Sequence, residues 1–190
     1  MDKFRKRLLE ALIFFAREVK SPTKMMLFKL LAELDFRHFK EKGYPVTNLE
    51  YEAWPMGPVP REFNREISTE KDLVIPNDFA DALVCERFDF EKSDGSLGFG
   101  FKFYAKRKPD LSVFSPRQQR ILKEVSEIYK NASATEASKA SHEPGQPWTQ
   151  TSPGEIIDLV RSIKLKKPLT DEEAREMMEE IAAFHKTYHS

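Results

Sequence analysis

Asp35 and His38 are the first side chains that could do chemistry, because they lie three residues apart within a strongly apolar segment. This spacing makes two side chains neighbours on one helix face, where a carboxylate can orient an imidazole and raise its basicity. Such a pair could act as a general acid and base. Catalysis would also need a nucleophile or an open cavity, and no motif supplies either. We favour the alternative, a buried hydrogen-bond network with a structural role.

His142, which is followed by Glu143 and Trp148, could suggest a metal or catalytic site. However, the four histidines and the single cysteine show no H-x-x-x-H or C-x-x-C spacing. We therefore expect no metal, no cofactor and no catalytic residue, and we do not expect an enzyme. His142 should instead make a local hydrogen bond, beside a loop that Trp148 fixes against the core. The predicted structural polar network consists of Asp35, His38 and His142.

The composition is that of a globular chain of 190 residues, which is long enough for one domain with a sizeable core. Lysine plus arginine and aspartate plus glutamate both total 31, so the net positive charge that drives non-specific binding to nucleic acid is missing. The single Cys85 cannot form an internal disulfide, and no apolar run approaches the roughly 20 residues that span a bilayer. We predict a cytoplasmic protein without membrane contact, and nucleic acid is not the expected partner.

Apolar residues at helical spacing predict two helices in the first part of the chain. The first covers residues 4–19 and has one apolar face. Ser21 or Thr23 can cap the second, which runs to about Lys42 and ends at Gly43. Apolar residues cover most of its surface, so we expect this central helix to be buried on most sides. Its narrow polar arc contains only Lys29, Glu33, Arg37 and Lys40.

Residues 44–60 are rich in proline and turn-forming residues. Within them, three prolines in the stretch 54–60 remove backbone donors and fix φ, so regular helix is excluded there. We predict an ordered aromatic loop. Pro60 fits the first position of a short helix that carries Phe63 and Ile67.

A period-two apolar pattern predicts a β-hairpin around the turn-rich residues 92–96. A two-stranded hairpin is only marginally stable by itself, so we expect its aromatic rings to pack in part on the helices. The five rings concerned are Phe88, Phe90, Phe99, Phe101 and Phe103.

Four positions in the C-terminal half have a serine or threonine three residues before a glutamate or glutamine, which is the capping-box spacing. We therefore predict helices after Ser115, Ser133, Ser152 and Thr170. The resulting fold class is α+β and mostly α-helical, with about six to eight helices around the buried central helix and one small β-hairpin at the edge. One domain should cover residues 1–168, with residues 169–190 as an appended amphipathic helix.

Two blocks of residues, in matching order and spacing, resemble one known family. The first block is Thr23-Lys24, Leu30-Leu31, Asp35, His38, Gly43, Pro45-Val46-Thr47, Tyr51, Ala53 and Gly57-Pro58-Val59. The second is Tyr129, Ser133-Ala134, Ser141-His142-Glu143, Pro147-Trp148 and Gly154-Glu155. The blocks are similar to the Panacea domain, including its SocA-like antitoxin members, and the resemblance covers about residues 4 to 165.

This resemblance implies an antitoxin encoded beside a toxin, which would hold that cognate protein toxin inactive by direct contact. One branch of the family implies an alternative, a proteolytic adaptor or chaperone that delivers the toxin to a protease. A DNA-binding autoregulator is a further alternative, but the charge is balanced and no helix-turn-helix is recognisable. The last alternative is a hydrolase that uses Asp35 and His38 as catalytic residues. The family's toxins are diverse, so the toxin itself is not identified.

Two segments are candidates for contact with a partner. Residues 54–60 offer a rigid aromatic loop with a large anchoring area at little entropic cost, although such a loop can also simply cover the core. The C-terminal helix carries an apolar stripe that could dock into a groove on a partner or pack on its own domain. The candidate contact residues are Tyr51, Trp54, Met56, Phe63, Met177, Met178 and Tyr188.

Overall fold

The computed structural model describes residues 1–68, 72–92 and 94–188, and residues 183–188 by their backbone alone. Within these residues, seven α-helices and two small antiparallel two-stranded sheets form a mostly helical α+β fold that is 49% helix and 17% strand. The predicted fold class is therefore confirmed. Among the described residues, no helix combines the length and the apolar character that crossing a bilayer would require.

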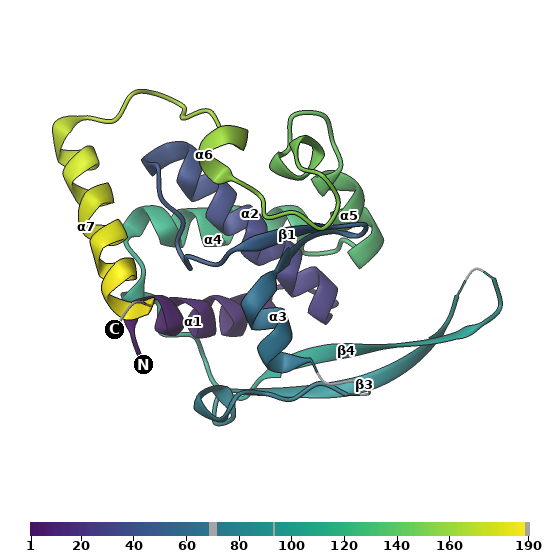
Figure 1. Ribbon diagram of the computed structural model, residues 1–190. Coiled ribbons are helices and arrows are strands. Elements are labelled where there is room, and N and C mark those ends of the chain that lie inside the picture. Colours follow the sequence, from purple (N-terminus) through teal and green to yellow (C-terminus); the bar gives the residue numbers. More distant parts are fainter. Residues whose placement is uncertain (69–71, 93, 189–190) are drawn as a thin grey trace.

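Helix α2 (Lys24–Lys42) crosses the middle of the molecule, with α1 (Lys3–Glu18) packed against it (Figure 1). The Thr23 hydroxyl caps its start by accepting from the Met26 amide at 3.2 Å. Gly43 ends it with φ +78°, a left-handed conformation that favours glycine. All of its apolar residues except the half-buried Met25 are buried, so the helix is buried on most sides, as predicted. The polar arc was wrong in one position, because Lys29 is only 2% exposed.

The segment expected to be an aromatic loop contains a tight hairpin of β1 (Tyr51–Trp54) and β2 (Gly57–Pro60). Its prolines are tolerated because β2 is an edge strand, where a missing amide donor costs little. On its other edge, β1 binds an extended stretch at residues 154–157. There the Ala53 amide donates to the Glu155 carbonyl at 2.9 Å.

This third extended stretch explains why the helix predicted after Ser152 is absent. The Ile157 amide donates to the Tyr51 carbonyl at 2.8 Å, so the backbone is extended where a helix would begin. Only the short α6 (Leu159–Ser162) follows, and Asp158 caps it by accepting from the Arg161 amide at 3.1 Å. The backbone pairing with β1 outweighed the local capping-box signal at Ser152.

The other three capping boxes do start helices, as predicted. Both reciprocal bonds are present at Ser115, Ser133 and Thr170. They begin α4 (Pro116–Tyr129), α5 (Ala134–Ser141) and α7 (Asp171–Tyr188). The remaining elements are α3 (Arg61–Ile67) and three 3₁₀ turns, η1 (Asn77–Phe79), η2 (Leu111–Val113) and η3 (Pro147–Gln150).

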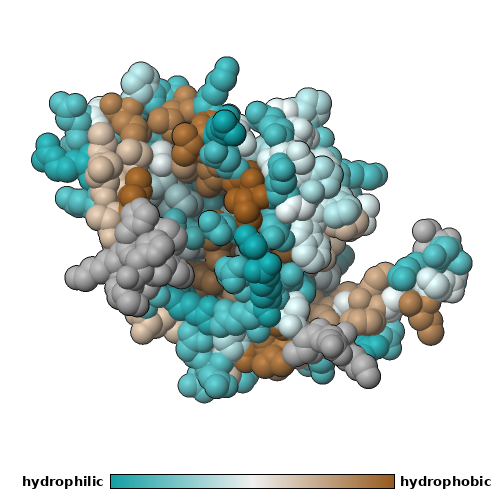
Figure 2. Space-filling view, in the orientation of Figure 1, coloured by the Kyte–Doolittle hydropathy of each residue, from teal (hydrophilic) through white to brown (hydrophobic). Residues whose placement is uncertain are grey.

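The one hairpin that the sequence predicted is confirmed as β3 (Leu83–Glu91) and β4 (Leu97–Ala105), in addition to the unpredicted β1–β2 hairpin. The rings of the β3–β4 hairpin divide into two groups. Phe101 and Phe103, near the body, are buried. The outer half projects beyond the helices (Figure 1), and apolar atoms lie on its exposed tip (Figure 2). Phe90 and Phe99 there are 44% and 49% exposed, so the expectation that they pack on helices was wrong.

Glycines on the opposite strand accommodate the outer rings. The register pairs Phe88 with Gly100 and Phe90 with Gly98, and each ring lies across its glycine. A Cβ on Gly100 would lie 2.7 Å from the Phe88 ring. The outer hairpin therefore partly covers its own rings.

We predict that the two halves of this hairpin contribute unequally to stability. Phe103→Ala should lower the free energy of unfolding by about 3–5 kcal/mol, because a fully buried ring leaves a cavity. Phe99→Ala should cost less than about 1 kcal/mol, because its ring is half exposed. Urea unfolding followed by fluorescence measures both. Similar losses for the two variants would contradict the projecting arrangement of the outer hairpin.

Candidate functional site

The Asp35 carboxylate ties the centre of α2 to the chain that follows it. It is fully buried and accepts hydrogen bonds from the amides of Val46 and Thr47, both at 2.8 Å. The Tyr51 hydroxyl donates to it at 2.7 Å, and the Thr47 hydroxyl also donates. Burial raises the pKa of Asp35, while the four donors favour its charged form. The carboxylate thus fixes the path from α2 into β1.

The His38 imidazole binds the same connecting segment but not Asp35. Its Nδ1 lies 2.7 Å from the Tyr44 carbonyl oxygen, which can only accept, so Nδ1 carries the proton. The His38 ring packs edge-on against the Tyr44 ring, with centroids 4.8 Å apart. Burial lowers the pKa of His38 to about 4, so the ring is neutral at neutral pH. This geometry supports a structural role and offers no acid/base pair.

His142 lies elsewhere, at the end of α5. Its ring stacks on the Trp148 ring with centroids 3.8 Å apart, and its buried Nε2 has no hydrogen-bond partner among the described residues. Burial, together with the charge of Lys29, lowers the pKa of His142. Among the described residues, no hydrogen bond joins His142 to Asp35 or His38, so the three do not form one network. No cluster of metal-binding side chains occurs in the described part of the chain.

The β1–β2 turn presents two large side chains to solvent on a rigid support. Trp54 and Met56 are 43% and 53% exposed. The Trp148 indole donates to the Trp54 carbonyl at 2.7 Å, and the Ser138 hydroxyl donates to the Met56 carbonyl at 2.8 Å. We call Trp54, Met56, His142 and Trp148 the turn surface. It combines exposed apolar area with a backbone held from behind, as protein-binding anchors do.

Lys29 lies directly beneath this turn. Its Nζ is buried and has no hydrogen-bond partner among the described residues, and burial lowers its pKa to about 8. A Cβ on Gly57 would lie 2.7 Å from Nζ and 2.5 Å from the Ser141 hydroxyl. Gly57 also has φ +104°, so both backbone and space require glycine here. The sequence predicted Lys29 on the polar surface of α2, because a lysine on a helix is usually solvated.

Two of the predicted contact residues belong to the core instead. Tyr51 is 1% exposed and donates to Asp35, while Phe63 is 3% exposed and packs edge-on against Phe28. Burial removes both from the surface available to a partner. The contact candidates near the N-terminal half therefore reduce to Trp54 and Met56.

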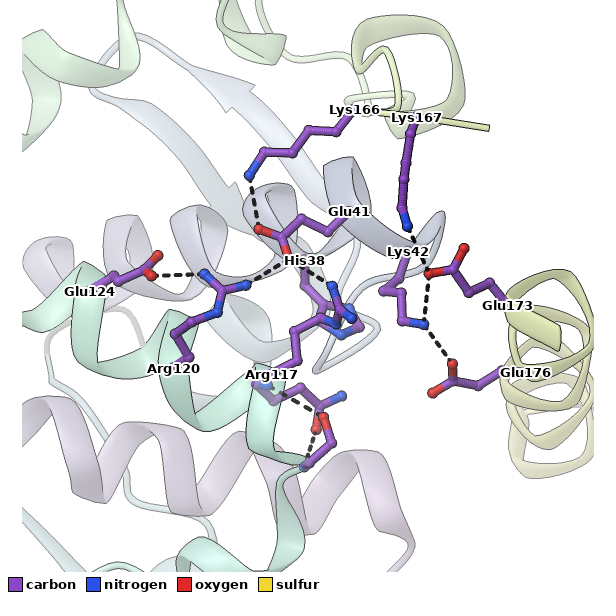
Figure 3. Close-up of polar contacts among 12 residues, drawn as sticks. His38, Glu41, Lys42, Arg117, Arg120, Glu124, Lys166, Lys167, Glu173 and Glu176 are labelled. Atoms are coloured by element: carbon purple, nitrogen blue, oxygen red, sulfur yellow. Dashed lines mark hydrogen bonds and ion pairs between the residues drawn. The ribbon is translucent and has the colours of Figure 1, made fainter. Parts of the chain in front are cut away.

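Helix α7 lies against the body through its acidic side (Figure 3). Lys42 pairs with Glu173 at 3.4 Å and with Glu176 at 2.9 Å, and the Tyr44 hydroxyl also donates to Glu176 at 2.7 Å. Glu180, one turn further on, pairs with Arg7 at 3.3 Å and with Lys3 at 2.9 Å. These contacts hold the helix to α1 and α2 mainly by charge.

The α7 contact candidates are placed unequally. Met177 is half-buried against Gly43, so it packs within its own chain. Met178 is 61% exposed. The Tyr188 side chain lies outside the described residues.

Substitutions at Asp35 should separate hydrogen bonding from charge. We predict that Asp35→Ala lowers the free energy of unfolding by about 3–5 kcal/mol, because two amides and two hydroxyls lose their buried acceptor. Asp35→Asn keeps one acceptor oxygen and should cost less, about 1–3 kcal/mol. Urea unfolding measures both. Equal losses would show that the charge, rather than the acceptor geometry, determines stability.

Lys29→Met should stabilise the protein at neutral pH, since it removes a buried, unpaired cation. The pKa of Lys29 falls from 10.5 to about 8 on folding, so the unfolded chain holds more protons between these values. Wild-type stability must then rise with pH across that window. The advantage of Lys29→Met, up to about 3 kcal/mol at pH 7, should shrink as pH approaches 10. An advantage independent of pH would contradict a buried charge.

The family model described as antitoxin SocA-like, Panacea domain, matches residues 27–149. The match contains the Asp35 contacts, the β1–β2 hairpin and the turn surface, whereas α1 and α7 lie outside it. No curated protein and no solved structure matches the chain. Because the match covers more than half of the 190 residues, the chain belongs to the SocA-like antitoxin Panacea domain family.

Proposed function

We propose that this protein is an antitoxin that neutralises a cognate protein toxin by direct binding. Membership of the SocA-like antitoxin family supports this role. The toxin is encoded by the adjacent gene, and the antitoxin inhibits it by covering its active surface. This mechanism requires no catalytic group, in keeping with the His38 and Asp35 side chains, whose hydrogen bonds all go to neighbouring chain segments.

The observation that carries the proposal is the turn surface. Trp54 and Met56 are exposed at the tip of a two-residue turn, and their carbonyl groups are both held by hydrogen bonds from elements far away in sequence. The Trp54 indole also donates to Glu52 at 2.8 Å, which restricts its rotamers. A partner that covers these side chains loses little conformational entropy, because they are already ordered. Exposed, preorganised aromatic side chains are typical anchors of protein interfaces.

The first test is co-expression with the neighbouring gene, followed by growth measurement and affinity capture. Rescue of growth together with a stable complex supports the proposal. Rescue with a falling toxin level and no stable complex would instead favour a proteolytic adaptor or chaperone that hands the toxin to a protease. A harmless neighbour, with nothing captured, would overturn the antitoxin assignment.

The turn surface itself is tested by Trp54→Ser. We predict roughly thirtyfold weaker toxin binding or more, because an interface anchor is removed. The free energy of unfolding should change by less than about 1 kcal/mol, because the Trp54 ring is half exposed. Titration calorimetry and thermal unfolding provide the two readouts.

Leu97→Ser is the matched control, because Leu97 is 83% exposed at the start of β4, on the projecting hairpin and away from the turn surface. This variant should bind the toxin as tightly as the wild type. Undiminished binding by a folded Trp54→Ser protein would place the toxin on another surface.

A further inference from the structure

A basic groove on the surface of the molecule ends close to the β1–β2 turn. It lies between α2 and residues 144–166 and has a cavity volume of about 680 Å³. At one end it adjoins a small hollow above Lys29, and four residues line both spaces. These shared residues are Glu33, Phe36, Gln146 and Pro147. Lys29 therefore lies at the inner end of the groove.

The acidic side chains of the groove are already neutralised by ion pairs. Glu33 binds Arg37 at 2.8 Å, and Glu124 binds Arg120 at 2.7 Å. Glu41 binds three cations (Figure 3), two of them from α4 and one from the segment after α6. Although burial acts in the opposite direction, the hydrogen bonds from these cations hold the pKa of Glu41 below its ordinary value. None of these carboxylates is left to balance further positive charge.

The groove retains cations without partners. Lys40 and Lys164 line it and form no ion pair among the described residues. Arg161, which is 88% exposed at its side chain, forms one long ion pair, with Asp158 at 3.9 Å. At the inner end, the Lys29 ammonium is buried with neither a hydrogen bond nor a counterion in the described chain. The positive potential therefore increases in strength from the open groove towards the buried lysine, where water is excluded.

We propose that this groove binds an acidic segment of the partner protein, with one carboxylate oxygen entering the hollow at the Lys29 Nζ. The proposal rests on the antitoxin function above and specifies the chemistry of the toxin's contact segment. The segment lies along Lys40, Lys164 and Arg161, next to the turn surface. Both sites then belong to one continuous interface around Trp148, which lines the hollow and supports the turn.

The small volume of the hollow favours a carboxylate over a nucleic-acid phosphate as the bound anion. Its volume is about 10 Å³, which is space for one water-sized group such as a single carboxylate oxygen. An aspartate or glutamate side chain can extend one oxygen into such a space. A nucleic-acid phosphate is carried on a bulky backbone, which could not follow it to a lysine that is only 2% exposed. The balanced charge of the chain also argues against a nucleic-acid ligand.

Fluorescence anisotropy with two labelled peptides tests the proposal without the toxin. One probe alternates glutamate and serine, and the other has glutamine in place of each glutamate. The wild-type protein should bind the glutamate probe in a salt-sensitive manner and bind the glutamine probe much more weakly. Lys29→Met should weaken binding of the glutamate probe about tenfold or more, because a buried charge pair is lost.

A second variant and a control keep the test independent of folding. Lys40→Ser with Lys164→Ser removes exposed charges and should weaken binding about two- to fivefold. Lys108→Ser, an exposed lysine outside the groove, should bind like the wild type. Equal binding of both probes, or full affinity in Lys29→Met, would overturn the proposal. Tighter binding of a single-stranded oligonucleotide than of the glutamate probe would overturn it as well.

The outcome is also separable from that of the antitoxin proposal. If the toxin complex survives in Lys29→Met but is lost in Trp54→Ser, the antitoxin role stands and the acidic contact falls. If the wild type captures no toxin from its neighbouring gene, the antitoxin role itself fails, whatever the peptide probes show. Loss of toxin binding in both variants supports the two proposals together.

Discussion

The burial of a carboxylate inside α2 is the constraint on which the rest of this structure depends. A charged Asp35 can stay in the core only if donors surround it, and the chain that follows α2 provides them from Val46, Thr47 and Tyr51. Those bonds determine where β1 begins. The hairpin, and the stretch 154–157 that pairs with it, then take positions that the local sequence does not specify.

Two of the buried ionisable side chains on helix α2 differ, because only one of them has hydrogen-bond partners among the described residues. We assign a structural role to the partnered Asp35 and a binding role to the unpartnered Lys29. Asp35 has all of its hydrogen bonds within the chain, whereas Lys29, nearly two turns earlier, has none in the described residues. An unsatisfied internal ammonium destabilises the fold, so its presence under the exposed turn needs another explanation. A ligand that brings the missing counterion explains it, and the adjacent Trp54 and Met56 supply the apolar contact area.

Charge also attaches the C-terminal part of the chain to the matched region. Glu41 joins α2, α4 and the segment after α6, and the acidic side of α7 binds Lys42 and Arg7 (Figure 3). The Lys42–Glu173 and Arg7–Glu180 pairs lie close to the body, with side chains only 10–15% exposed, so salt screens them less than fully exposed pairs. Met177 adds an apolar contact at Gly43.

The sequence by itself determined the helices with strong periodicity and caps and the β3–β4 hairpin, because these depend on neighbouring residues. The order and spacing of two blocks of residues also indicated the family. Only the tertiary structure decided the backbone conformation after Ser152, where pairing with β1 replaced the predicted helix. It also decided the burial of Tyr51 and Phe63, which pack in the core. Lys29 was likewise assigned to the surface by its type. Its burial depends on the hairpin and α5 meeting above it, which are contacts between residues far apart in the chain and invisible to any local pattern.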